Sequence, residues 1–249
     1  MNPRINLIVD EALDIDSKEK LKIFLENWMG DSIKNELFDL VNLNTKDIKN
    51  NYARALCFRL FENNGIIKRD LIDQIIKKLT PEDRSSLKKK GVKIGRYHIF
   101  LPRMLKPSAV TLRVTLWKVF FQDSRSLTLP KFGLNFLTKE KENKEFLLIC
   151  GFENFDKFYI RVDILERLFL KIIQISKNSR FKMNSDMMNL IGINKENFIK
   201  LLKLMSYRWE EKEETFTYIP KRNFKKISKP KTSHHKNNPF KALSEVRFK

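Results

Sequence analysis

Residues 185–219 read SDMMNLIGINKENFIKLLKLMSYRWEEKEETFTYI, and this stretch decides the fold class of the C-terminal half. Ser185 starts a short helix that ends at Gly192, and Asn194 caps a second helix whose apolar residues recur at helical spacing. Residues 207–219 place aromatic residues on both sides of a Glu-rich tip, which is typical of a β-hairpin. The stretch therefore predicts two helices followed by a hairpin.

The residues before this stretch extend the pattern. Asp163 is a candidate N-cap for one more helix, and two apolar runs, 146–149 and 158–162, predict strands joined through Gly151. Three helices followed by a hairpin is the order of a winged helix, and the short turn at 191–194 suits a helix-turn-helix. A plain helical packing module would give the same pattern, so the sequence leaves both interpretations open.

The N-terminal half has helical periodicity that glycine and proline interrupt. Residues 92–101 instead alternate as a strand does, with a bend at Gly95, and residues 110–120 return to helical spacing. The predicted helices before them run from Ser17 to Gly30, from Thr45 to Gly65, over 72–79, and from Thr80 to Gly91 with Pro81 in the first turn.

The chain is therefore predicted to be mainly α with small β elements. Its 249 residues are enough for one large or two small domains. Residues 122–144 have weak periodicity and predict a linker, which separates a helical module (1–121) from a winged-helix-like module (145–219). Residues 220–249 contain few core-forming side chains and are predicted to be a basic, disordered tail.

The charge is unevenly placed. Fifty basic and thirty acidic residues give a net charge of +20, and the predominance of Lys is typical of an AT-rich genome, so placement is more informative than the total. Residues 51–120 carry a net charge of +11 and residues 221–249 one of +9, and the window 84–118 holds ten basic residues and no acidic one. Such single-sign blocks are typical of proteins that bind nucleic acids or anionic membranes.

Aromatic residues interleave with the basic ones in the first block. Cations neutralise phosphates while rings stack on bases, which predicts binding of RNA or another single-stranded nucleic acid. Core packing is the alternative for Tyr97, because it alternates with apolar residues, and a structural role is equally open for His98. The predicted contact residues are Lys93, Arg96, Tyr97, His98, Arg103, Lys106 and Arg113, then Lys195, Lys200 and Lys203 in the winged-helix-like module, and Lys221, Arg222, Lys225 and Lys226 in the tail.

The sequence contains no arrangement that predicts an enzyme. Residues 7–12 resemble the acidic strand of an ATPase, but no phosphate-binding glycine loop precedes them. Cys57 and Cys150 are expected to be buried thiols, and the adjacent histidines at 234–235 lack a nearby acid or thiol for a metal. We expect no catalytic residue, metal or cofactor. Without a long apolar run or a signal-peptide pattern, we expect a cytoplasmic protein without a membrane segment.

Residues 91–107, GVKIGRYHIFLPRMLKP, resemble a motif in the C-terminal region of the mitochondrial degradosome-type (Suv-three-like) DExH RNA helicase family, in particular of its alphaproteobacterial members. In both, an apolar helix with Leu-Arg and a Trp follows, here at 112–117. Three further stretches are similar to the family in the same order: 161–168, 190–208 with Ser206 where glycine is usual, and 238–243.

The resemblance implies that the chain corresponds to the C-terminal accessory region of such a helicase. The two motor domains that carry the P-loop and the DExH box are not in this sequence, and in the family they perform ATP hydrolysis and unwinding. The resemblance therefore implies no catalytic residue here. It implies contact with RNA and support of a partner, either a helicase motor or an exoribonuclease.

Two other function classes are left open by the sequence. A free-standing winged-helix DNA-binding regulator would prefer duplex DNA and would usually bind spaced half-sites as a dimer. A ribosome-bound structural protein would need only the basic tail and would tolerate loss of the basic residues at 93–106.

Overall fold

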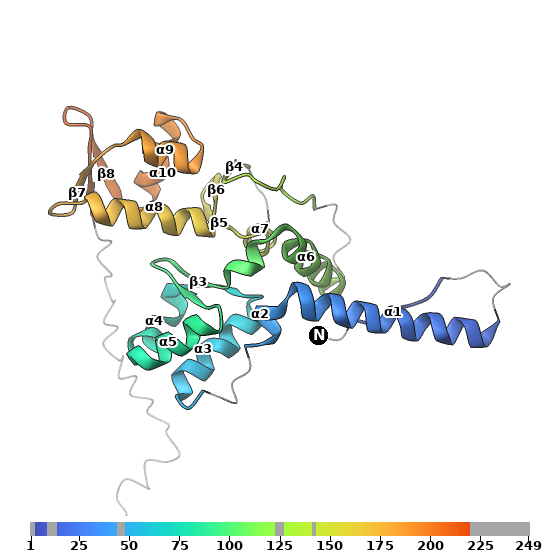
Figure 1. Cartoon of the computed structure of the whole chain (residues 1–249). Helices are drawn as coiled ribbons and strands as arrows, with labels where there is room; N and C mark the ends of the chain where they lie inside the picture. The colour runs from blue at the N-terminus through green and yellow to red at the C-terminus, as the bar shows by residue number, and fades with distance from the viewer. Residues whose placement is uncertain (1–2, 9–13, 44–47, 123–126, 141–142, 220–249) are drawn as a thin grey trace, which may run out of the picture. The chain divides into compact units, whose positions relative to one another are not determined.

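The computed structural model describes residues 3–8, 14–43, 48–122, 127–140 and 143–219. They belong to one compact unit that is mainly helical and contains three small antiparallel sheets of three strands each (Figure 1). The predicted fold class, mainly α with small β elements, is confirmed. The predicted tail at 220–249 lies outside the described residues.

The chain begins with three helices, α1 (Ile15–Glu36), α2 (Phe38–Val41) and α3 (Asn51–Glu62). The N-cap of α1 is Asp14, whose carboxylate accepts a hydrogen bond from the backbone N–H of Ser17, so Ser17 is not the cap. The helix also continues through Gly30, the predicted end, because a single glycine costs a helix only about 1 kcal/mol. The N-cap of α3 is Asn50, and the predicted cap Thr45 lies outside the described residues.

The first sheet has the strand order β1-β3-β2. The predicted extended segment 92–101 supplies both β2 and β3, with Gly95 between them, and is confirmed. The predicted start at Thr80 is also confirmed, since Thr80 and Asp83 form a capping box. The elements of this region are β1 (Ile66–Lys68), η1 (Arg69–Ile72), α4 (Asp73–Lys77), α5 (Pro81–Lys89), β2 (Lys93–Ile94), β3 (His98–Phe100), η2 (Pro102–Leu105) and α6 (Pro107–Phe121).

The second sheet has the order β4-β6-β5, from β4 (Phe136–Thr138), β5 (Phe152–Phe155) and β6 (Phe158–Arg161). The predicted strand at 146–149 is wrong, because these residues lie in the helix α7 (Lys144–Ile149). The Asn143 side chain accepts hydrogen bonds from two backbone N–H groups of its first turn, and a short apolar run has no periodicity that separates helix from strand. Within the predicted linker, β4 pairs with β6.

The third sheet belongs to the winged-helix-like module. Its order, β7-β9-β8, joins the predicted hairpin to a third strand that the sequence pattern did not indicate. Gly192 ends α9 in the left-handed conformation and the Asn194 side chain caps α10, as predicted. Arg161, not Asp163, is the N-cap of α8. The elements are α8 (Val162–Ile175), β7 (Arg180–Lys182), α9 (Ser185–Ile191), α10 (Lys195–Leu204), β8 (Tyr207–Glu210) and β9 (Thr215–Tyr218).

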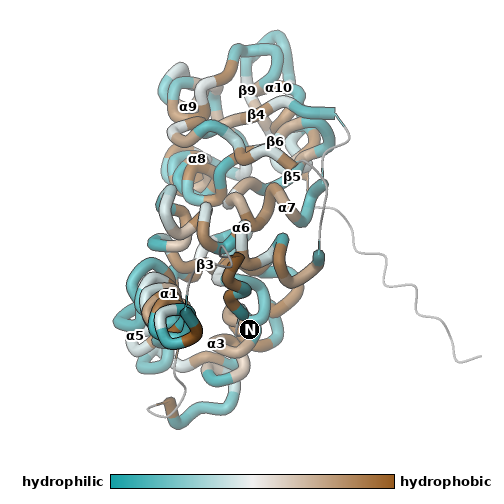
Figure 2. The backbone as a smooth tube through the Cα atoms, turned by 90° about the vertical axis from the view of Figure 1, so that its right-hand side faces the viewer, coloured by the Kyte–Doolittle hydropathy of each residue, from teal (hydrophilic) through white to brown (hydrophobic). Residues whose placement is uncertain are grey.

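The buried hydrophobic residues form separate clusters in the three regions described above. One cluster lies within residues 37–109, and a second comprises α8, α9, α10 and the strands beside them. A third joins α6, which is largely hydrophobic along its length (Figure 2), to α7 and the second sheet. In the part of the chain that the structure describes, no helix is both long enough and apolar enough to cross a membrane.

Candidate nucleic-acid interface

The turn between β2 and β3 carries the centre of the predicted binding residues. The carboxylate of Glu166, from α8, accepts hydrogen bonds from the backbone N–H groups of Arg96, Tyr97 and His98 at 2.6, 2.8 and 2.9 Å. A Cβ added at Gly95 would lie 2.4 Å from the Glu166 Cδ atom, so only glycine allows this close approach. The turn is thus held in place by a residue of the other half of the chain.

A second element holds the turn from within the N-terminal half. Arg69 of η1 donates a guanidinium hydrogen bond to the carbonyl oxygen of Gly95 at 2.9 Å, and its backbone N–H donates to the carbonyl oxygen of Tyr97 at 2.8 Å. The turn is hydrogen-bonded to Glu166 on one side and to Arg69 on the other. The backbone that carries the exposed Arg96 side chain is therefore constrained.

His98 is not at the surface, which corrects its prediction as a contact residue. Its side chain is buried, with Nε2 2.7 Å from a carboxylate oxygen of Glu153 and Nδ1 3.9 Å from a carboxylate oxygen of Glu166. Lys68 donates to the other oxygen of Glu153 at 2.6 Å. Burial alone would raise the pKa of Glu153, but the hydrogen bonds from His98 and Lys68 outweigh it and lower the pKa. This buried network links β1 and β3 to β5.

Arg113 is likewise buried, so its prediction as a phosphate contact is wrong. Its guanidinium donates to the carbonyl oxygens of Asn64 at 2.8 Å and of Met104 at 2.5 Å. Burial lowers its pKa to about 10, because the charged form is desolvated. The residue fastens α6 to the loop before β1 and to η2, which is a structural role.

The remaining cations of the first block are exposed. Lys93 lies 5.6 Å from the centre of the Phe100 ring, and neither Lys93 nor Arg96 has an acidic partner among the described residues. Arg103 is exposed but pairs with Asp39 at 3.3 Å, which offsets its charge. Lys106 is exposed at the N-cap position of α6. Of the predicted contact residues in this block, Lys93, Arg96 and Lys106 are thus exposed and have no acidic partner among the described residues.

Tyr97 belongs to the core more than to the surface, the alternative that the sequence allowed. It is half-buried and packs edge-on against Phe169 of α8, with 4.1 Å between ring centres. Burial, followed by the nearby Tyr207 and Tyr218 hydroxyls, raises the pKa of Tyr97 above its usual value. Its ring is not free to stack on a base.

Tyr218 of β9 is a further exposed aromatic side chain, which the sequence analysis did not single out. It lies opposite Tyr207 in the β8–β9 pair, with 5.2 Å between ring centres, and it remains 40% exposed. Tyr97, which follows Arg96 in the turn, packs against the hydrophobic cluster that includes Tyr207, so the turn lies beside this hairpin. Burial raises the pKa of Tyr207 to about 12. We call Lys93, Arg96 and Tyr218 the junction edge.

The cations of α10 are arranged differently. Lys195 pairs with Glu214 at 2.5 Å, and Lys200 lies 4.0 Å from Glu196. Lys203 is exposed and has no acidic partner among the described residues. The loop between β8 and β9 carries three glutamates and one lysine at 211–214, so this end of the module is acidic. The predicted residues Lys221, Arg222, Lys225 and Lys226 lie outside the described residues.

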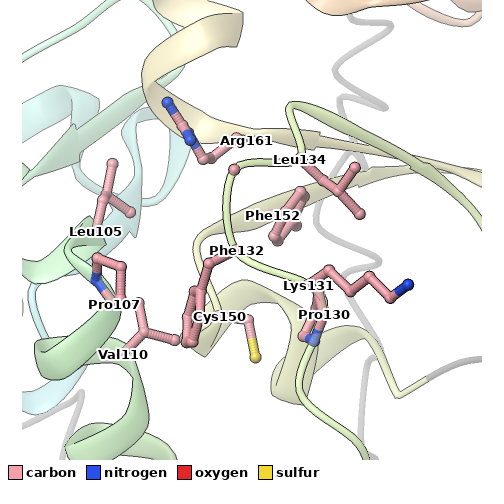
Figure 3. A pocket seen from close by; sticks show the side chains of 11 residues that line it. Leu105, Pro107, Val110, Pro130, Lys131, Phe132, Leu134, Cys150, Phe152 and Arg161 are labelled. Carbon is pink, nitrogen blue, oxygen red and sulfur yellow. The ribbon is translucent and has the colours of Figure 1, made fainter.

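A small apolar cavity lies between α6, the segment 130–134 and β5 (Figure 3). Its volume is about 70 Å³, well below the 300 Å³ or more of typical small-molecule pockets. Cys150 lines it, and burial raises the pKa of this thiol to about 12, which suppresses the reactive thiolate. Among the described residues, no group of three His, Cys, Asp or Glu side chains could hold a metal ion.

Comparisons of the chain with protein-family models, with curated proteins and with solved structures give no match. The resemblance to degradosome-type RNA helicases therefore rests on the quoted motifs alone. Two of the quoted stretches contact each other in the structure, because Glu166, in 161–168, accepts hydrogen bonds from the turn in 91–107.

Proposed function

We propose that the chain is a non-catalytic, cytoplasmic RNA-binding protein part that contacts single-stranded RNA through the junction edge. It would serve as the C-terminal accessory region of a degradosome-type RNA helicase and support a separate motor or exoribonuclease. The observation that carries the proposal is the pair of exposed cations, Lys93 on β2 and Arg96 on the turn that Glu166 constrains. The turn lies beside the hairpin that carries the partly exposed Tyr218.

The chemistry of this edge suits an unpaired strand. Lysine and arginine neutralise phosphates irrespective of sequence, and an exposed ring stacks on any base for about 1–3 kcal/mol. Preorganisation adds to the effect, because a turn that is already constrained loses less conformational entropy when RNA binds. The two buried cysteines, both free thiols, suit a reducing compartment.

A salt titration of single-stranded RNA binding by the full chain tests the proposal. We compare the Lys93→Glu/Arg96→Glu variant with Lys88→Glu/Lys89→Glu, which makes the same change in net charge at two exposed lysines of α5. The junction-edge variant should bind more than about tenfold more weakly and should reduce the slope of log K against log salt by about 1.4, at 0.7 per phosphate. Equal losses in both variants would show bulk charge attraction and refute the proposed site.

A second candidate function is duplex DNA binding by the winged-helix-like module. The order α8-β7-α9-α10-β8-β9 and the sheet order favour it, since this topology is that of a winged helix. The acidic loop between β8 and β9 and the paired lysines of α10 disfavour it. Competition between duplex DNA and single-stranded RNA decides: preference for duplex, with loss of binding in Lys200→Glu/Lys203→Glu, would establish this candidate instead.

A further inference from the structure

The helix α1 buries none of its 22 residues in this fold. Leu21, Phe24 and Trp28, at positions i, i+3 and i+7, form an apolar row along it, and Phe24 and Trp28 are 64% and 62% exposed. We call this row the α1 stripe. Viewed along its axis in Figure 2, α1 shows hydrophobic positions among hydrophilic ones.

Among the described residues, the packing of α1 leaves this stripe exposed. α1 packs against α2 and α6, and its half-buried residues Leu25, Met29 and Ile33 lie on the face beside the stripe. The last turn of α6 adds three further exposed apolar side chains, those of Val119, Phe120 and Phe121. Exposed apolar patches of more than a few hundred Å² mark interaction sites in soluble proteins, and helices are stabilised chiefly by packing of such a face.

We propose that the α1 stripe is the interface of a homodimer in which two copies of α1 pack antiparallel about a two-fold axis. The charges of α1 carry the choice of a second copy. Residues 15–22 have a net charge of +1 and residues 23–36 one of −2, so an antiparallel pair brings opposite charges together at both ends. The two helix dipoles are antiparallel in this arrangement, which is electrostatically favourable.

The stripe specifies a register. An axis that passes between Phe24 and Leu25 places Leu21 against the partner's Trp28 and Lys18 against the partner's Asp31. By symmetry each of these contacts occurs twice, as in any isologous interface. The Phe24 rings of both copies meet near the axis.

The exposed apolar side chains contribute a large part of the area that a dimer interface needs. Aromatic side chains offer roughly 150–250 Å² each, and the α1 stripe with the last turn of α6 exposes four of them together with several aliphatic residues. Several hundred Å² per copy approaches the roughly 800 Å² per partner of a standard specific interface.

Sedimentation velocity of the full chain at low to high micromolar concentration tests the proposal. Wild type should sediment as a dimer, Phe24→Glu/Trp28→Glu as a monomer, and the control Leu170→Glu/Ile173→Glu, at two exposed residues of α8, as a dimer. Since α1 buries no residue, thermal unfolding should show the first variant to be folded. A monomeric wild type at all concentrations, or a dimer that persists in Phe24→Glu/Trp28→Glu, would overturn the proposal.

A charge exchange tests the register. Lys18→Asp should weaken the dimer about tenfold, because the new carboxylate at position 18 of each copy would face the partner's Asp31. Lys18→Asp/Asp31→Lys should restore the affinity to within about twofold of wild type, because the pair is exchanged across the axis. In a parallel dimer each position would face its own copy, so the double variant would not recover, and the antiparallel register would be rejected. These outcomes are independent of RNA binding.

Discussion

The turn between β2 and β3 and the helix α10 both present cations that the sequence predicts to bind nucleic acid, and they do so in opposite ways. On the turn, a buried carboxylate from another element binds the backbone and leaves Lys93 and Arg96 without acidic partners among the described residues. On α10, exposed carboxylates pair with Lys195 and Lys200 themselves. A glutamate bound to backbone preserves the charge of neighbouring cations, whereas a glutamate bound to the cation offsets it.

The difference has consequences for stability as well as for binding. Glu166 is buried and satisfies three backbone N–H groups, so its loss would leave these donors without partners. Glu196 is exposed, and surface ion pairs contribute little.

The largest expected effect is on folding stability. Glu166→Ala should lower the free energy of unfolding by about 3–5 kcal/mol, because three backbone N–H donors, two part-buried and one buried, lose their acceptor. Chemical denaturation followed by circular dichroism measures this change. Glu196→Ala serves as the matched control and should change stability little. If both variants unfold at the same denaturant concentration, the turn is not held by Glu166.

Charge reversal at the two regions should affect RNA binding unequally. Lys93→Glu/Arg96→Glu should weaken single-stranded RNA binding by more than about tenfold, whereas Lys200→Glu/Lys203→Glu should weaken it by less than about threefold, because Lys200 is already near an acid. Fluorescence anisotropy at one fixed salt concentration compares the two directly. A larger loss in the α10 variant would reverse the assignment of the interface.

Removing the exposed ring should have a smaller effect. Tyr218→Ala should weaken RNA binding about fivefold. This loss corresponds to about 1 kcal/mol, the lower end of the range for one stacked base. Tyr218→Phe should bind as wild type does, because it keeps the ring. Tyr52→Ala is the control, since Tyr52 is similarly exposed but lies on α3. Loss of binding in Tyr218→Phe would indicate hydrogen bonding by the hydroxyl in place of stacking.

The smallest effect concerns acid stability and compares two glutamates whose pKa is lowered. Glu153 is buried against His98 and Lys68, and Glu214 is exposed against Lys195. A lowered folded-state pKa contributes stability above the unfolded pKa near 4.5, and this contribution is lost as pH falls through the folded value. Between pH 6 and 3, approximate limits that bracket this transition, Glu153→Gln should therefore flatten the decline in thermal midpoint. Glu214→Gln should leave the decline as it is in wild type, and identical profiles for all three proteins would contradict this account.

Much of the local structure follows from the sequence. The helix starts at Thr80 and Asn194, the helix end at Gly192 and the bend at Gly95 depend on side chains within a few positions, so cap and turn chemistry predicts them. The errors at Gly30 and at 146–149 have local causes too. A single glycine is a weak helix breaker, and a four-residue apolar run has no readable period.

The candidate site was predicted only in part. The basic block around Lys93 and Arg96 could be predicted from the sequence, because the placement of charges along a chain does not depend on tertiary contacts. Folding alone buries His98 and Arg113, brings acids to Arg103 and Lys195, and places the turn at 95–97 beside the hairpin that carries Tyr218. Each of these outcomes depends on burial or on a partner from a separate element, and folding creates both when it brings distant residues together.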